Sequence, residues 1–175
     1  MRRWFFFGVM GSGLLLAQVN NNLVSEARFP WTVVRDNLLK MAEKMPAENY
    51  GFKPTPEIES FAQRLAHIAG ANLFVCQGVM GKQSALTRSA AGTKTELIEL
   101  LKQSSAACDS AFDSLSDAGA LEKIPSRLGG PFPPEATRTK LATLNNMVRH
   151  SNEMYGYMSV YLRLKGIVPP SSAQE

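Results

Sequence analysis

Four stretches of this sequence repeat apolar residues with the period of an α-helix, and turn-rich segments separate them. No alternating pattern of useful length predicts a β-strand. An amphipathic helix cannot bury its apolar stripe alone, so four such helices on one chain are expected to pack together. The sequence therefore predicts an all-α protein, an up-and-down four-helix bundle, with no internal repeat and no second domain.

Capping residues and prolines set the expected limits of the four helices. The first helix is expected over residues 31–44, and the second from Thr55-Pro56, an N-cap residue followed by proline. Thr93 and Glu96 form a capping-box pair that opens the third helix. The fourth helix is expected to end at Lys165, because a glycine and then a pair of prolines follow it.

Length, charge and histidine content narrow the function classes. A chain of 175 residues with 45% hydrophobic content can bury a substantial core. The net charge of +4 comes without a clustered basic run, so no nucleic acid is expected as a partner. The chain has two histidines, so any histidine-based catalysis would have to use His67 or His150.

The first seventeen residues have the pattern of an export signal. Met1-Arg2-Arg3 is a short basic region, an apolar run extends to Leu16, and Ala17 is a small residue suited to cleavage. The run is shorter than the ~20 residues of a spanning helix. We therefore expect a periplasmic or secreted protein with no stable membrane span, and an uncleaved anchor is the alternative. Residues 18–27 are expected to form a short extension before a bundle over residues 28–175.

Export would place Cys76 and Cys108 in an oxidising compartment, where a disulfide has to be considered. If the second and third helices are antiparallel neighbours, the two cysteines are offset along the bundle by on the order of 15 Å. A disulfide needs Cα atoms within about 7 Å of each other. On that assumption, two buried free thiols are expected.

Two blocks of the sequence resemble a known family. One runs from His150 through Met154-Tyr155-Gly156 to Ser172, and the other is Tyr50 to Glu57, followed by Ala66-His67-Ile68. Both are similar to the DinB/YfiT-like four-helix bundles. The resemblance implies a divalent metal, zinc or nickel, held by one histidine on the second helix and an H-x-x-x-H pair on the fourth. His67 and His150 match two of these ligands, and Met154 occupies the place of the third.

Helical periodicity gives a less specific interpretation of the same residues. At ~100° per residue, Met154 lies inside the apolar stripe of the fourth helix and His150 at its flank. This pattern is typical of a core methionine and a boundary histidine. His67 falls almost opposite the main stripe of its helix, so periodicity predicts that it is exposed. Only the resemblance brings His67 and His150 together.

Methionine at the third position weakens the metal hypothesis. A thioether binds zinc or nickel poorly and favours copper(I), whereas catalytic zinc normally has three strong protein ligands. Glu153 and Tyr157 lie within a turn or two of His150, but each points about 60° or more away from the direction of Met154. Neither side chain simply fills the place of the missing imidazole.

Three function classes remain open, and with them the question of whether the protein is an enzyme. The first is a metal-free bundle that binds a small apolar or amphipathic ligand in a cleft lined by Phe74, Glu153, Met154 and Tyr157. The alternative is a metal-dependent hydrolase or transferase of the cell envelope. The resemblance implies activities that use low-molecular-weight thiols, but export separates the protein from these cytoplasmic cosubstrates. A copper-binding protein is the third class. The small-molecule partner stays unidentified, and a homodimer stays open.

Overall fold

The computed structural model describes residues 22–83, 92–125 and 137–173. The predicted signal, residues 1–17, lies outside the described residues. Within the described ranges, no helix combines the length and the apolar character needed to cross a membrane.

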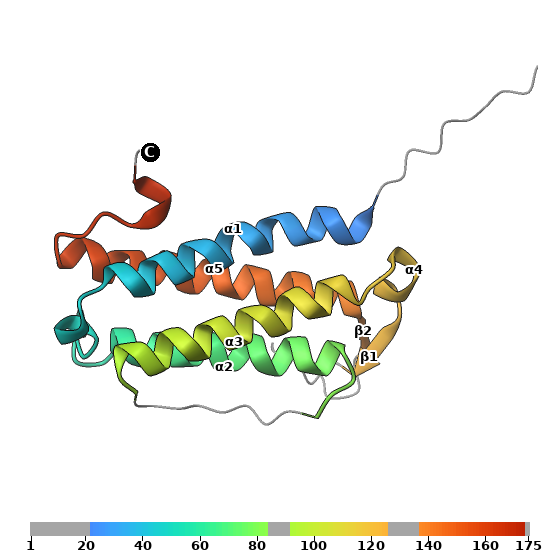
Figure 1. Ribbon diagram of the computed structural model, residues 1–175, viewed down its shortest axis with the longest axis horizontal. Coiled ribbons are helices and arrows are strands. Elements are labelled where there is room, and N and C mark those ends of the chain that lie inside the picture. The colour runs from blue at the N-terminus through green and yellow to red at the C-terminus, as the bar shows by residue number, and fades with distance from the viewer. Residues whose placement is uncertain (1–21, 84–91, 126–136, 174–175) are drawn as a thin grey trace, which may run out of the picture.

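Four long helices form a bundle, which confirms the predicted all-α class (Figure 1). They are α1 (Leu23–Lys44), α2 (Phe61–Val79), α3 (Lys94–Asp113) and α5 (Lys140–Leu164). The shorter elements lie at the two ends of the bundle: η1 (Ala47–Asn49), α4 (Asp117–Ala120), β1 (Lys123–Pro125), β2 (Thr137–Thr139) and η2 (Pro170–Ser172).

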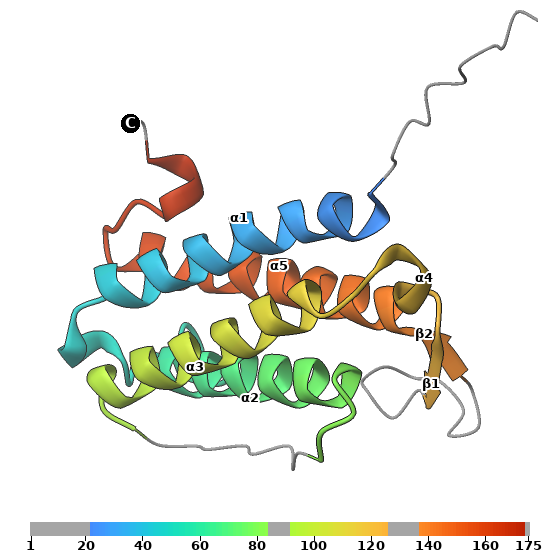
Figure 2. The same cartoon turned by 45° about the vertical axis from the view of Figure 1, so that its right-hand side comes forward.

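The directions of the helices differ from a simple up-and-down series, because α2 and α3 run parallel to each other (Figures 1 and 2). Both begin near the end of α1. The Lys94 ammonium donates to the carbonyl oxygen of Met45 at 2.8 Å, and the ring of Phe61 packs on Tyr50 with centroids 5.1 Å apart. The connection over residues 80–93 is long enough for this path, since at ~3.3 Å per extended residue it exceeds the ~28 Å length of α2.

Helix α1 begins earlier than expected. It starts at Leu23, since the side chain of Asn22 caps it and the carboxylate of Asp117 accepts two N–H groups of its first turn at 3.2 Å each. The helix continues through Pro30, where one intrahelical hydrogen bond is lost. Residues 23–27, expected as an extension, therefore belong to the first helix.

The start of α2 also moves, whereas α3 and α5 follow their expected limits. A capping box of Ser60 and Gln63 opens α2 at Phe61 rather than at Thr55. The capping box predicted for α3 is present, with both of its hydrogen bonds. Gly166 follows α5 with φ of +73°, the left-handed conformation that commonly ends a helix.

A two-stranded sheet lies at the end of the bundle near α4, and the sequence pattern did not predict it (Figure 1). β1 pairs with β2 in antiparallel fashion, with Ile124 opposite Arg138. Each strand has three residues. Alternation over so few residues is too short to be distinguished from loop sequence.

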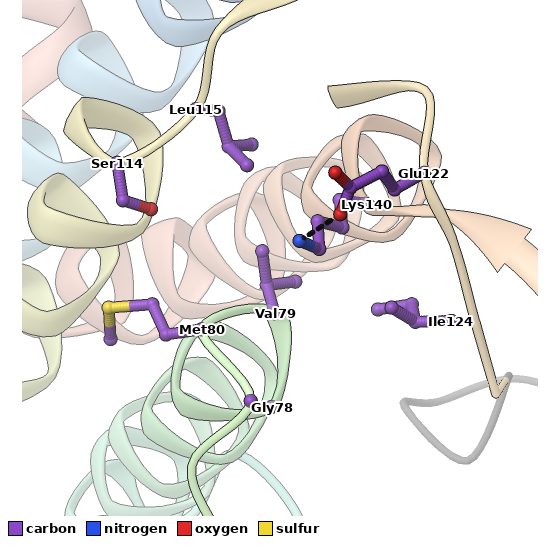
Figure 3. A pocket seen from close by; sticks show the side chains of 9 residues that line it. Gly78, Val79, Met80, Ser114, Leu115, Glu122, Ile124 and Lys140 are labelled. Carbon is purple, nitrogen blue, oxygen red and sulfur yellow. Dashed lines mark hydrogen bonds and ion pairs between the residues drawn. The ribbon is translucent and has the colours of Figure 1, made fainter. Parts of the chain in front are cut away.

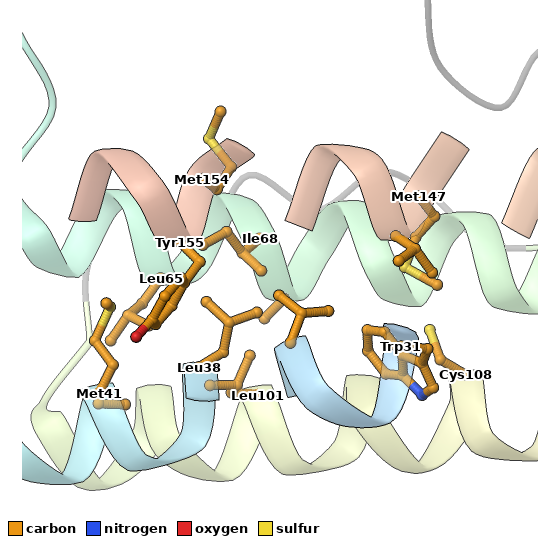
Figure 4. Packing of buried hydrophobic residues seen from close by; sticks show 14 of the residues in the cluster. Trp31, Leu38, Met41, Leu65, Ile68, Leu101, Cys108, Met147, Met154 and Tyr155 are labelled. Carbon is orange, nitrogen blue, oxygen red and sulfur yellow. The ribbon is translucent and has the colours of Figure 1, made fainter. Parts of the chain in front are cut away.

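The core lies between the four helices, and a disulfide crosses it between α2 and α3. Figure 4 shows Cys108 beside Trp31, and both side chains are fully buried. Cys76 and Cys108 form the bond, with Cα atoms 4.9 Å apart. The expectation of two free thiols is therefore wrong. It assumed antiparallel helices, whereas in parallel helices two cysteines near the C-terminal ends lie level with each other.

Candidate functional site

His67 of α2 and His150 of α5 meet across the interface between these two helices. Their Nε2 atoms are 3.1 Å apart, and the ring planes are inclined by 75° with centroids at 5.2 Å. One Nε2 donates a hydrogen bond and the other accepts it, with the roles set by the tautomers. The predicted convergence of these two histidines is confirmed.

Helix α2 packs against α3 on one side and against α5 on another, which explains why His67 is not exposed. The face opposite its main apolar stripe meets α5, and both imidazoles are part-buried. A buried hydrogen bond fixes the register of the two helices, since Ser151 Oγ donates to Asn72 Oδ1 at 3.0 Å. Ser151 follows His150 directly, so this bond also positions the imidazole.

The third expected position, Met154, is buried and lies beside an arginine. Arg64 Nη1 donates to the Met154 sulfur at 3.7 Å. Figure 4 shows Met154 pointing away from Leu38 and Leu101, which fill the centre of the core. Arg64 was not among the predicted site residues, although it precedes His67 by three residues, a spacing that places both on one helix face.

The charge of Arg64 is only partly balanced. Its Nε lies 3.2 Å from a carboxylate oxygen of Glu59, and the Glu59 side chain is 48% exposed. The geometry of this ion pair does not make a hydrogen bond, and within the described residues the buried Nε has no hydrogen-bond partner. The guanidinium therefore keeps unused donors beside the histidine pair.

Burial favours the neutral form of His150. It lowers the pKa of His150 below its ordinary value of 6.5, and the neighbouring His67 adds to this effect. The carboxylate of Glu153 opposes the shift, whereas Arg149 and Arg64 reinforce it.

The donor set does not fit a divalent metal held by three strong ligands. Two imidazoles converge, but the third position is a thioether in contact with a guanidinium, whose positive charge disfavours a second cation. Glu153 is not available as a replacement, because its exposed carboxylate accepts from Tyr157 Oη at 3.2 Å and pairs with an arginine of its own helix. No group of three His, Cys, Asp or Glu side chains in the described ranges is arranged to hold a metal.

A pocket of about 410 Å³ is lined by Arg64, the residue that contacts Met154 and precedes His67 by three positions. Its walls are otherwise apolar or aromatic, and the lining residues are Pro54, Ile58, Arg64, Tyr157, Val160 and Tyr161. Of the four expected cleft residues, Tyr157 lines this pocket, Met154 contacts Arg64 and Glu153 contacts Tyr157. Phe74 does not line the pocket, and its part-buried side chain packs against the core instead.

A second pocket, of about 480 Å³, lies near the other end of α2, roughly 16 Å along the helix from His67. Figure 3 shows apolar side chains around it and an ion pair at its edge. Lys140 Nζ and Glu122 form this pair at 2.6 Å, so the two charges neutralise each other. None of the predicted site residues lies in this pocket, whose lining residues are Gly78, Val79, Met80, Gly81, Ser114, Leu115, Glu122, Ile124 and Lys140.

Comparison with known proteins gives a family and a fold. The sequence model of the DinB superfamily matches residues 31–158, which include both histidines, Arg64 and Met154. The chain belongs to the DinB superfamily. No curated protein matches it.

Solved structures similar to this DinB-superfamily chain share its fold at low sequence identity. A DinB-like protein from Bacillus cereus is 15% identical with a TM-score of 0.67, covering 83% of this chain and 95% of that one. A DinB-like protein from Bacillus subtilis is 17% identical with a TM-score of 0.63, covering 87% and 99%. A mutant of a mycothiol-dependent maleylpyruvate isomerase is 15% identical with a TM-score of 0.60, covering 80% and 66%.

Proposed function

We propose that this DinB-superfamily protein is a metal-free bundle that binds a small organic molecule in the pocket between α2 and α5. The observation that carries the proposal is the position of Arg64. Its guanidinium contacts the sulfur at the third-ligand position and also lines the adjoining pocket. A positive side chain thus stands where the family resemblance implies that a metal would bind.

The chemistry of the histidine pair supports binding rather than metal-dependent catalysis. The two imidazoles hydrogen-bond to each other, and the third position offers a soft thioether in place of a third strong ligand. The pocket beside them has the apolar walls and the single charged group that are typical of small-molecule sites.

Export is part of the same proposal. The basic start and the apolar run of residues 1–17 are its first support, and the Cys76–Cys108 disulfide is the second, since disulfides persist in oxidising compartments. The mass of the native protein tests this point. A mature chain that starts near Gln18 is the expected result, and an intact Met1 in a soluble cytoplasmic fraction would contradict it.

Metal analysis tests the central claim. Wild-type protein purified without a histidine tag is expected to contain far less than one zinc per chain. Met154→His adds an imidazole one turn from His150 and is expected to tighten zinc binding by about a hundredfold or more, since even changes around a ligand cost about 10–100-fold. Combining it with Arg64→Gln should tighten binding further, because the competing positive charge is removed.

Met154→Leu is the matched control, since it removes the sulfur without adding a ligand and should leave zinc binding weak. The same variant tests copper, because copper(I) that binds the wild type tightly and Met154→Leu weakly would favour a copper-binding protein. One tightly held zinc per wild-type chain would overturn the proposal and favour a metal-dependent hydrolase or transferase.

A further inference from the structure

We propose that the pocket beside Arg64 binds a singly charged organic acid, a monocarboxylate with an aromatic or branched apolar body. This inference rests on the proposed function and extends it by naming the class of ligand. Three features carry it: the guanidinium of Arg64, whose Nη1 faces a weak acceptor, the absence of a second charge among the pocket-lining residues, and the apolar and aromatic walls.

Arg64 can hold a carboxylate without a large rearrangement. A guanidinium has five N–H donors in a planar fork that matches a carboxylate. In this protein Nη1 faces the Met154 sulfur, a weak acceptor, whereas the Nε–H is buried beside Glu59, so a ligand would approach the part of the side chain that lines the pocket. The competing Glu59 carboxylate is half exposed, and such ion pairs contribute little to stability. A ligand carboxylate in the pocket would therefore gain charge-assisted hydrogen bonds at small cost.

The charge of the pocket fits one negative charge and not two. Arg64 is the one charged residue among those that line it. Glu59 already balances part of that charge from outside the pocket. Neither His67 nor His150 is among the residues that line the pocket, so neither places a second positive charge in its wall. A second carboxylate would lose water without gaining a charged partner, which is unfavourable.

The walls favour a flat or branched apolar body. Ile58, Val160 and Pro54 provide aliphatic surface, and the rings of Tyr157 and Tyr161 add aromatic surface. Aromatic ligands pack on such rings edge to face or offset, with a gain beyond burial alone. The volume of about 410 Å³ lies in the range of sites for small molecules.

The Tyr161 ring is held in place by a part-buried hydrogen bond, whereas Tyr157 is half exposed and bonds to another exposed side chain. Tyr161 Oη donates to the carbonyl oxygen of Glu59 at 2.7 Å, and Tyr157 Oη donates to Glu153 at 3.2 Å. The Tyr161 ring also packs edge-on against Phe52, with centroids 6.2 Å apart. The Tyr161 wall is therefore oriented before a ligand arrives, which lowers the entropic cost of binding.

Titration of the mature protein with four related probes, followed by amide NMR shifts, tests the inference. The probes are 3-phenylpropionate, its neutral amide, 3-phenylpropylamine and the dicarboxylate phenylsuccinate. The monocarboxylate is expected to bind with a Kd on the order of 1 mM, as suits its size, and to shift the amides of Tyr157 and Tyr161. The amide and the amine should bind at least about tenfold more weakly, and the dicarboxylate no more tightly than the monocarboxylate.

Two arginine variants form a matched pair for the charge argument. Arg64→Gln is expected to weaken binding of 3-phenylpropionate by about tenfold or more. Arg149→Gln removes the same charge from an exposed position of α5 that does not line the pocket, and it should leave binding unchanged. Glu59→Gln provides a variant that keeps the pocket walls intact. It should tighten binding severalfold, because it removes the competing carboxylate.

The outcomes separate this inference from the proposed function. If the acid and its amide bind equally well, or if the wild type and Arg64→Gln bind 3-phenylpropionate equally well, the pocket does not select a negative charge. That result would overturn this inference and leave the proposed ligand binding by a metal-free bundle intact. If phenylsuccinate binds more than tenfold more tightly than the monocarboxylate, the claim that the pocket prefers a singly charged ligand is wrong. A metal-free protein that binds none of the probes has no monocarboxylate site, whereas stoichiometric zinc in the wild type would overturn the proposed function itself.

Discussion

Helix α2 meets α3 and α5 through two interfaces of different chemistry. Against α3, it is joined by the buried Cys76–Cys108 disulfide and apolar side chains. Against α5, it meets a row of polar contacts that we call the polar seam: Arg64 with Met154, His67 with His150, and Asn72 with Ser151. Hydrophobic residues of the same size would stabilise the second interface at least as well. The polar seam lies next to the pocket that Arg64 lines, which agrees with the ligand site proposed there.

The two interfaces lie on different faces of the same helix, so each can be changed without direct contact with the other. The disulfide closes a loop with a sequence separation of 32 residues and restricts the unfolded chain. The polar seam acts in the folded state, where each buried polar group depends on its partner. Changes at the disulfide should therefore alter stability and leave the pocket intact, whereas changes in the seam should alter both.

The largest effect is expected from removal of the disulfide. Cys76→Ala combined with Cys108→Ala should lower the free energy of unfolding by roughly 3–4 kcal/mol, the value expected for a loop of this length. Urea unfolding of the oxidised wild type and the double variant measures it. The far-ultraviolet spectrum and the zinc content should stay unchanged. Equal urea midpoints for both proteins would show that the disulfide does not stabilise this bundle.

A smaller loss is expected at the buried end of the polar seam. Ser151→Ala leaves the fully buried Asn72 without its one hydrogen bond to another side chain in the described residues, at a cost of about 1–3 kcal/mol. Adding Asn72→Leu removes the unsatisfied amide, so the double variant should recover part of that loss. Urea unfolding of the two single variants and the double variant gives the coupling. If the changes in the free energy of unfolding of the two single variants add up to that of the double variant, a direct hydrogen bond between Ser151 and Asn72 is contradicted.

Helix content and caps could be predicted from the sequence because they depend on neighbouring residues. The capping box of Thr93 and Glu96 and the helix end at Gly166 are present as expected. The start of α1 has one local signal, the Asn22 cap, which did not enter the prediction. It also depends on Asp117, whose carboxylate approaches from a distant part of the chain.

The candidate site was only partly predictable, since periodicity describes one helix at a time. His67 lies opposite the main stripe of α2, and it is part-buried because α5 covers that face. The disulfide was missed because the direction of α3 relative to α2 depends on how the helices pack, which the pattern of a single helix does not contain. The role of Arg64 depends on the contact of its guanidinium with Met154, which no spacing rule contains.

The smallest expected effect separates the two interfaces by their response to pH. Burial and the nearby His67 lower the pKa of His150 in the folded protein below 6.5, whereas the unfolded chain keeps the ordinary value. Below about pH 6.5 the unfolded chain therefore binds more protons than the folded protein, and stability falls as the pH decreases.

The variant His150→Gln removes this titration. The drop in thermal unfolding temperature between pH 7.5 and pH 5.0 should be larger for the wild type than for His150→Gln, because the other acidic and basic groups are common to both proteins. The disulfide does not titrate, so the cysteine double variant should keep the pH response of the wild type. Identical drops for the wild type and His150→Gln would show that the histidine pair stays hydrated, and the polar seam would then not be a buried interface.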